Sequence, residues 1–155
     1  MTNIIELKGP GVKWEVVPAI DLAQYTINRT YSIAGAKAVC TSCHDGTHSH
    51  NSGHHQDDPT ALSYAIDLRI SNLYSKIQPH GGRQWWLMVQ AFAHTLAANL
   101  AEFLAVKKIA GRFDVVLEAT HIHTEWSDGR TPPNIVGWAS KQFVYPTKEV
   151  QGFLA

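Results

Sequence analysis

The chain has 155 residues, of which 45% are hydrophobic, and this size and composition are typical of one domain with a single core spanning residues 1–155. Lys and Arg number 13 in total, as do Asp and Glu, so the formal net charge at neutral pH is zero. This balance gives no basic footprint for nucleic acid or an anionic membrane, so we expect neither partner, and we expect a monomer.

The N-terminal segment 1–8 lacks a basic stretch followed by an apolar one, which indicates cytoplasmic synthesis without a secretory signal. The two cysteines, Cys40 and Cys43, make no disulfide framework and suit a reducing compartment. Polar and charged residues interrupt the longest apolar stretch, 85–110. We therefore expect no plain membrane span.

In chain order, segment 12–17 mixes β-branched and aromatic residues as strands do, and Pro18 then opens a short helix predicted to end near Ile27. Segment 30–41 is predicted to be extended, with a turn or bulge at Gly35. Segment 43–62 is rich in Gly, Ser, Asn, Asp and His, and this composition is typical of a loop that a metal could order.

Segment 63–69 is predicted to be a strand and 70–77 a short helix. From Arg83 to about Ile109, apolar residues recur every three or four positions, which predicts a long amphipathic helix with Gly111 as its C-cap.

Segments 113–118 and 121–126 are predicted to be a pair of strands, or one strand with an irregularity near Ala119-Thr120. The tail from Ser127 onward gives no clear pattern. We expect an α+β fold.

Histidines gather in two short clusters far apart in the sequence. The first cluster contains His44, His48, His50, His54 and His55, and the second contains His121 and His123.

Between the two histidine clusters, Asp67 lies in an apolar run, where burying a carboxylate costs several kcal/mol unless it is paired or binds metal. Arg69, on the same face of a strand, offers a salt bridge as the simpler explanation. A catalytic metal site with His and Asp ligands is the other explanation.

The run Cys40-Thr41-Ser42-Cys43-His44 matches the CxxCH pattern of covalent haem attachment, which would require an exported or specialised compartment. A redox CxxC motif typically opens a helix, whereas this one opens a Gly/His loop. The simplest interpretation is two small apolar residues at the end of a strand, and a metal clip formed by the thiols is a further alternative.

His121 and His123 stand two positions apart, so a strand would place both imidazoles on one face, where one could bind metal and the other could lie beside it. Glu118 precedes them closely enough to activate water at a metal if the Ala119-Thr120 step turns its side chain inward. A solvated carboxylate at a strand end is the alternative for Glu118.

These segments carry a resemblance. The sequence resembles the D-alanyl-D-alanine carboxypeptidase and hedgehog-type zinc fold, in its phage and bacterial peptidoglycan peptidase branch. The resemblance lies in residues 45–55, 65–69, 113–118 and 121–123. The resemblance covers about residues 36–126. It implies a small antiparallel sheet with flanking helices.

The resemblance also implies one Zn²⁺ ion and a set of site residues. The zinc ligands would be His54, Asp67 and His123, with Glu118 as general base, His121 as a transition-state or substrate contact, and His48 lining the site. Zinc lowers the pKa of its water and polarises the scissile carbonyl, and the general base moves the proton to the leaving amine. Arg29 and Arg69 are candidates to bind a substrate carboxylate, because Arg makes bidentate pairs with that group.

The sequence departs from the family pattern in two places. His54 and Asp67 are farther apart than in the family, with segment 56–62 filling the gap, so His50 or His55 is an alternative ligand. The family also places its base three residues before the last ligand. That position is Thr120 for His123 but Glu118 for His121. The alternative is therefore that His121, and not His123, is the third ligand, with Glu118 as its base.

The resemblance thus implies a zinc metallopeptidase that hydrolyses an amide bond in peptidoglycan peptides containing D-amino acids, of the endolysin or carboxypeptidase type. A phage-encoded enzyme acting on the host cell wall would fit the absence of a signal segment. The alternative is a non-catalytic zinc-binding module, either a virion protein or a hedgehog-like structural or interaction domain.

Overall fold

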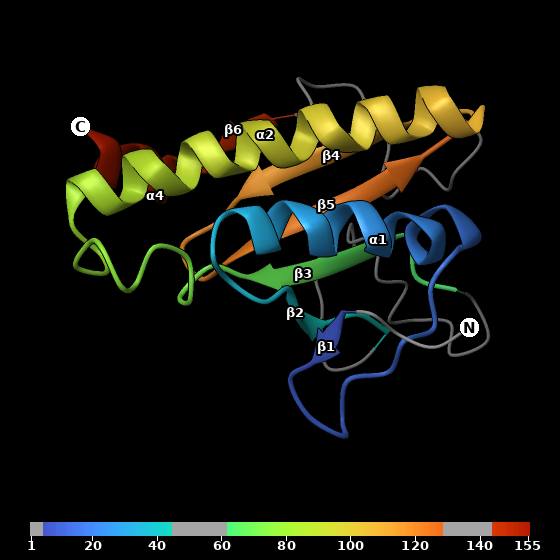
Figure 1. The fold of residues 1–155 in the computed structure, drawn as a ribbon, viewed down its shortest axis with the longest axis horizontal. Coiled ribbons are helices and arrows are strands. Elements are labelled where there is room, and N and C mark those ends of the chain that lie inside the picture. The colour runs from blue at the N-terminus through green and yellow to red at the C-terminus, as the bar shows by residue number, and fades with distance from the viewer. Residues whose placement is uncertain (1–4, 45–61, 129–143) are drawn as a thin grey trace.

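The structure is a computed structural model that describes residues 5–44, 62–128 and 144–155. Within these ranges the chain forms a six-stranded sheet, and helices α1 and α2 lie side by side on one of its faces (Figure 1). The elements are β1 (Glu6–Leu7), α1 (Pro18–Ile33), β2 (Val39–Ser42), β3 (Ala65–Arg69), α2 (Arg83–Lys107), β4 (Arg112–Leu117), β5 (His121–Ser127), β6 (Val144–Pro146) and α4 (Lys148–Leu154). This arrangement confirms the expected α+β class.

The strand order is β1-β2-β3-β5-β4-β6. The four inner strands are antiparallel, but β1 pairs in parallel with β2, and β6 in parallel with β4. The sheet is therefore mixed, and not antiparallel throughout as expected. For β1 and β2 the reason is that α1 crosses over between them, and such a crossover returns the chain in the same direction.

Helix α1 begins at Pro18, as predicted, but continues past Ile27 to Ile33. The predicted extended conformation of residues 30–33 is wrong. Apolar residues on the buried face continue to Tyr31, whose hydroxyl donates a hydrogen bond of 2.6 Å to the carbonyl of Arg69 in β3. Tertiary packing of this face outweighs the weak local preference of β-branched Thr30. Gly35 then adopts a φ of 77° in a turn, as predicted.

Helix α2 confirms the long helix predicted from Arg83 onward. Its C-cap is Lys108, with a left-handed φ of 56°, and not Gly111. Gly111 is needed for another reason: its φ is 96°, and a Cβ there would collide with the Ser127 carbonyl at the end of β5. Among the described residues, α2 is also the one helix long and apolar enough to cross a membrane, a test that buried core helices pass as well.

The short helix predicted for residues 70–77 is wrong, because the segment forms successive turns. The amides of Leu73 and Ile77 each bond three residues back, and Tyr74 has a left-handed φ of 56°. The predicted strand 12–17 contributes an isolated bridge between Val16 and Ser63.

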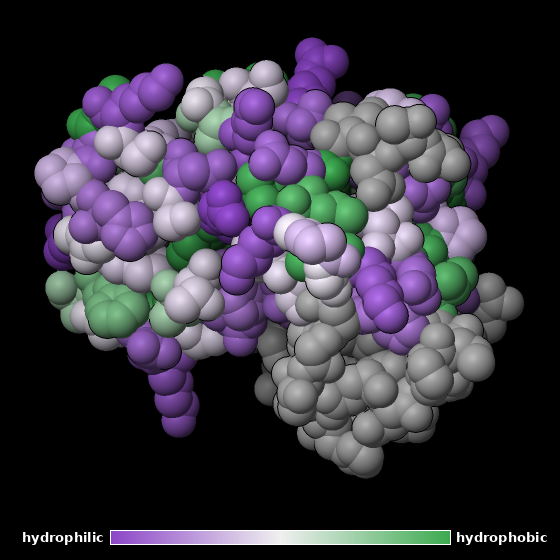
Figure 2. All heavy atoms as spheres, turned by 90° about the horizontal axis from the view of Figure 1, so that it is seen from below, coloured by the Kyte–Doolittle hydropathy of each residue, from purple (hydrophilic) through white to green (hydrophobic). Residues whose placement is uncertain are grey.

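The two faces of the sheet differ in character. Ile66, Leu68 and Ile122 join α1 and α2 in the hydrophobic core. Residues alternating with them, such as Asp67 and His123, point to the opposite face. Seen from the β1 edge, the described surface is mainly hydrophilic around a small hydrophobic patch (Figure 2). The fold therefore packs one face of the sheet into the hydrophobic core and gathers polar side chains on the other.

Candidate metal centre

The polar face of β3 and β5 brings together Asp67, Glu118, His121 and His123. One ligand atom from each of these side chains lies within 4.8 Å of the other three. Asp67 is the direct cross-strand partner of His123, and β-strand alternation places His121 on the same face. Of the residues expected from the sequence to lie together, these four are adjacent in space.

The Asp67 carboxylate lies between the two imidazoles. Its Oδ1 atom is 2.9 Å from His123 Nδ1 and 3.5 Å from His121 Nε2. His121 Nε2 is also 2.5 Å from Glu118 Oε2. Asp67 and His123 are buried, whereas His121 and Glu118 are partly exposed. The cluster therefore has a buried side and a side open to an incoming molecule.

Glu118 reaches the cluster because the chain turns at Ala119-Thr120, where the sequence predicted an irregularity. The amide of Glu118 donates a hydrogen bond of 2.9 Å to the carbonyl of His121, which closes a hairpin between β4 and β5. Glu118 consequently stands opposite His121 on the same face. Thr120 Oγ1 lies 2.9 Å from His121 Nδ1, so Thr120 contacts one ring nitrogen while the other faces the carboxylates.

Two further buried carboxylates, Glu125 and Asp114, lie on the polar face of the sheet beyond His123, and the sequence did not predict either. Glu125 Oε1 lies 3.2 Å from His123 Nε2, and Asp114 stands across the strand pair from Glu125. Arg112 Nε lies 3.2 Å from Asp114 Oδ1. The signal was available: Glu125 follows His123 by two positions, so alternation along one strand places both on one face.

The surroundings of these groups shift their pKa values. Burial lowers the pKa of His123, but hydrogen bonds to Asp67 and Glu125 outweigh it and raise the pKa to about 10. Burial likewise lowers the pKa of His121, yet the Glu118 hydrogen bond and the Asp67 charge raise it overall. The carboxylates around both imidazoles thus favour positive charge at the centre of the cluster, which is the environment a metal cation needs.

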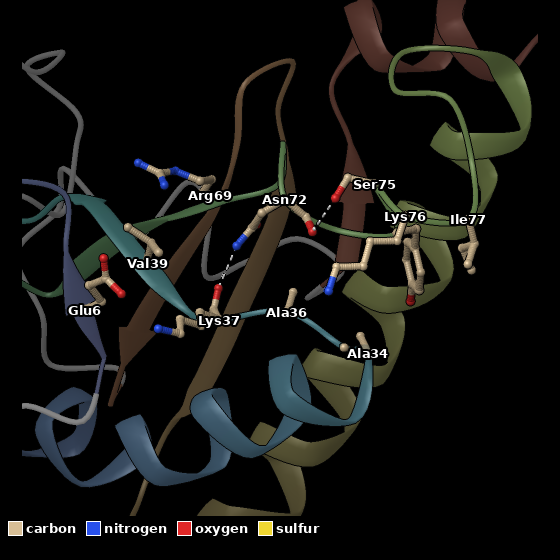
Figure 3. Close-up of a pocket in the computed structure, with 12 residues that line it drawn as sticks. Glu6, Ala34, Ala36, Lys37, Val39, Arg69, Asn72, Ser75, Lys76 and Ile77 are labelled. Atoms are coloured by element: carbon tan, nitrogen blue, oxygen red, sulfur yellow. Dashed lines mark hydrogen bonds between the residues drawn. The ribbon is translucent and has the colours of Figure 1, made fainter.

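The two arginine candidates lie in different places. Arg69 is the cross-strand partner of His121, and it lines a cavity of about 510 Å³. In this cavity Arg69 and Lys37 lie toward one end, and Lys76 toward the other (Figure 3). Arg29 is exposed on α1 and lines a groove against α2, over the helical face of the sheet. The structure therefore places Arg69 beside the cluster but does not bring Arg29 to it.

Several other candidates of the sequence analysis fall outside the described residues. These are His48, His50, His54, His55 and segment 56–62. His44 Nδ1 lies 3.1 Å from Glu15 Oε2. The thiols of Cys40 and Cys43 are buried in the core, in agreement with their interpretation as small apolar residues at the end of a strand.

The donor set fits one divalent metal ion. Imidazole nitrogens with carboxylate oxygens suit Zn²⁺, and the described residues supply two of each. His123 also has a carboxylate at its second ring nitrogen, an arrangement common around metal-ligating histidines. No family model, curated protein or solved structure matches the chain.

Proposed function

We propose that the chain is a zinc-dependent peptidase that hydrolyses an amide bond in peptidoglycan peptides containing D-amino acids. The observation that carries the proposal is the convergence of Asp67, Glu118, His121 and His123, whose ligand atoms lie within 4.8 Å of one another. These are the described residues to which the resemblance to peptidoglycan peptidases gives roles. Their convergence supports a catalytic metal site, while the peptide substrate comes from the resemblance.

His54, Asp67 and His123 would hold the ion, with His121 as the alternative to His123. Bound Zn²⁺ lowers the pKa of water and polarises the carbonyl of the scissile bond. Glu118, partly exposed at the open side of the cluster, would accept the proton from the attacking water and deliver it to the leaving amine. His121, whose Nε2 atom contacts Glu118, would hold this carboxylate at the site and contact the substrate.

The cavity of about 510 Å³ that Arg69 lines offers room for part of a peptide substrate, although the four residues of the cluster do not line it. Arg69 connects the two, because it pairs with His121 across the strands and also lines the cavity. Its guanidinium would bind a carboxylate of the cell-wall peptide. A phage-encoded protein would meet this substrate in the host cell wall.

The test measures zinc content and peptidoglycan hydrolysis together. Glu118→Gln should retain zinc and lose at least about 100-fold in turnover, because general acid-base catalysis contributes about that much or more. The matched control Glu102→Gln removes an exposed carboxylate on α2 and should leave both measurements unchanged. Wild-type protein that binds no zinc would refute the metal site. Zinc binding without release of peptide fragments would favour the non-catalytic module.

A further inference from the structure

Glu125 occupies an unusual position for a carboxylate. Its side chain is 1% exposed, and its Oε1 atom lies 3.2 Å from Nε2 of His123, which is 5% exposed. The opposite nitrogen of the same ring, Nδ1, is 2.9 Å from Asp67 Oδ1. The imidazole is therefore held between two carboxylates, one at the candidate metal centre and one behind it.

We infer that Glu125 is a positioning residue that fixes the ring of His123 so that Nδ1 faces the metal centre. The inference rests on the proposed function, since it concerns how a ligand of that site is oriented. A neutral imidazole binds metal through one nitrogen and carries its proton on the other. A carboxylate that accepts this proton's hydrogen bond fixes both the tautomer and the ring orientation, and makes the ligand a stronger donor.

The strand geometry explains how Glu125 is held in place. Side chains along β5 alternate between the two faces of the sheet. His123 and Glu125 therefore both lie on the polar face, and Thr124 between them points to the other side. Asp114 stands across from Glu125 on β4.

Stability alone does not account for Glu125. Burying a carboxylate costs several kcal/mol, and an apolar residue at this position of β5 would avoid that cost. His123 gives this carboxylate a charge-assisted hydrogen bond. A polar pair retained at this cost beside a candidate ligand indicates a role in orienting that ligand.

The experiment compares Zn²⁺ affinity of the full-length wild type with Glu125→Ala, Glu125→Gln and the control Asp114→Asn. Affinity is measured by competition with a chromophoric chelator, with far-UV circular dichroism to check folding. Removal of such an outer partner typically weakens metal binding 10- to 100-fold, which we expect for Glu125→Ala. Glu125→Gln keeps an acceptor oxygen and should recover part of the loss. Asp114→Asn changes a buried carboxylate on the same face and should bind within about twofold of wild type.

Nuclear magnetic resonance of ¹⁵N-histidine-labelled protein gives a readout that a general loss of stability would not produce. In the zinc-loaded wild type, the Nε2 proton of His123 should be observed and protected from exchange, and in Glu125→Ala it should exchange faster. If the wild type binds zinc and Glu125→Ala binds it equally well, the inference fails while the proposed metal site stands. An equal loss in Asp114→Asn would also overturn it, because the effect would then be general electrostatics. A wild type without zinc affinity would refute both.

Discussion

The stability of the fold should depend on pH through Asp114, and Asp114→Asn isolates this effect. The side chain is fully buried, and burial raises its pKa from about 3.8 to about 7, partly opposed by the nearby Arg112 guanidinium. A raised pKa means that the fold prefers the protonated carboxyl group. The favourable contribution is therefore complete below about pH 4 and is lost as the pH rises through 7.

The size of the effect follows from the same values. One pKa unit corresponds to about 1.4 kcal/mol, so the difference between 3.8 and 7 sets an upper limit of about 4 kcal/mol. Relaxation of the structure around the ionised group reduces this limit, and we expect about 2–4 kcal/mol. Asn has a similar shape and no charge to bury, so Asp114→Asn should gain this amount relative to wild type between pH 4 and pH 8.

Urea unfolding in the presence of a chelator, at several pH values from 4 to 8, measures the free energy of unfolding of both proteins. Taking the difference between variant and wild type cancels the titration of groups common to both. The control Glu102→Gln removes an exposed carboxylate and should change stability by less than about 0.5 kcal/mol at either end of the range. A difference for Asp114→Asn that stays constant from pH 4 to 8 would refute the reasoning.

Two further substitutions test the packing that positions the site. Gly111→Ala should destabilise the protein by about 2–4 kcal/mol, since φ is positive there and the new Cβ would meet the Ser127 carbonyl. A fall in melting temperature measures this loss, and an unchanged value would show that the contact is not tight. Tyr31→Phe should cost about 1–3 kcal/mol, because the buried Tyr31 side chain loses its 2.6 Å hydrogen bond to the Arg69 carbonyl. Chemical denaturation would show it, and a loss below about 0.5 kcal/mol would contradict the assigned role of this bond.

The elements that could be predicted are those with a strong repeating pattern. Helix α2 shows apolar residues every three or four positions over most of its length, and β5 alternates along a run rich in β-branched and aromatic residues. The second half of α1 and the turns of residues 70–77 were predicted wrongly because long-range contacts decide them. Tyr31 bonds to β3, and the Leu73 carbonyl accepts a 2.7 Å hydrogen bond from the Trp85 indole. A local pattern does not contain these partners.

The same distinction applies to the candidate site. The proximity of His121 and His123 follows from spacing within one strand. Their proximity to Asp67, however, depends on the register of β3 against β5, which the sequence alone does not give. Glu125 was missed although it lies two positions from His123, because a carboxylate in a strand suggests an exposed face until its burial is known.

The two faces of the sheet separate stability from the proposed function. The helical face contributes the hydrophobic core, in which Ile66, Leu68 and Ile122 are fully buried. The opposite face of the same strands buries Asp67 and His123, whose desolvation disfavours folding unless their charges are compensated. Apolar residues at these positions would fit the sheet at a lower desolvation cost. A bound cation therefore explains the burial of Asp67 and His123 better than folding does. Zinc binding should therefore stabilise the folded protein, and removing the metal should lower its melting temperature.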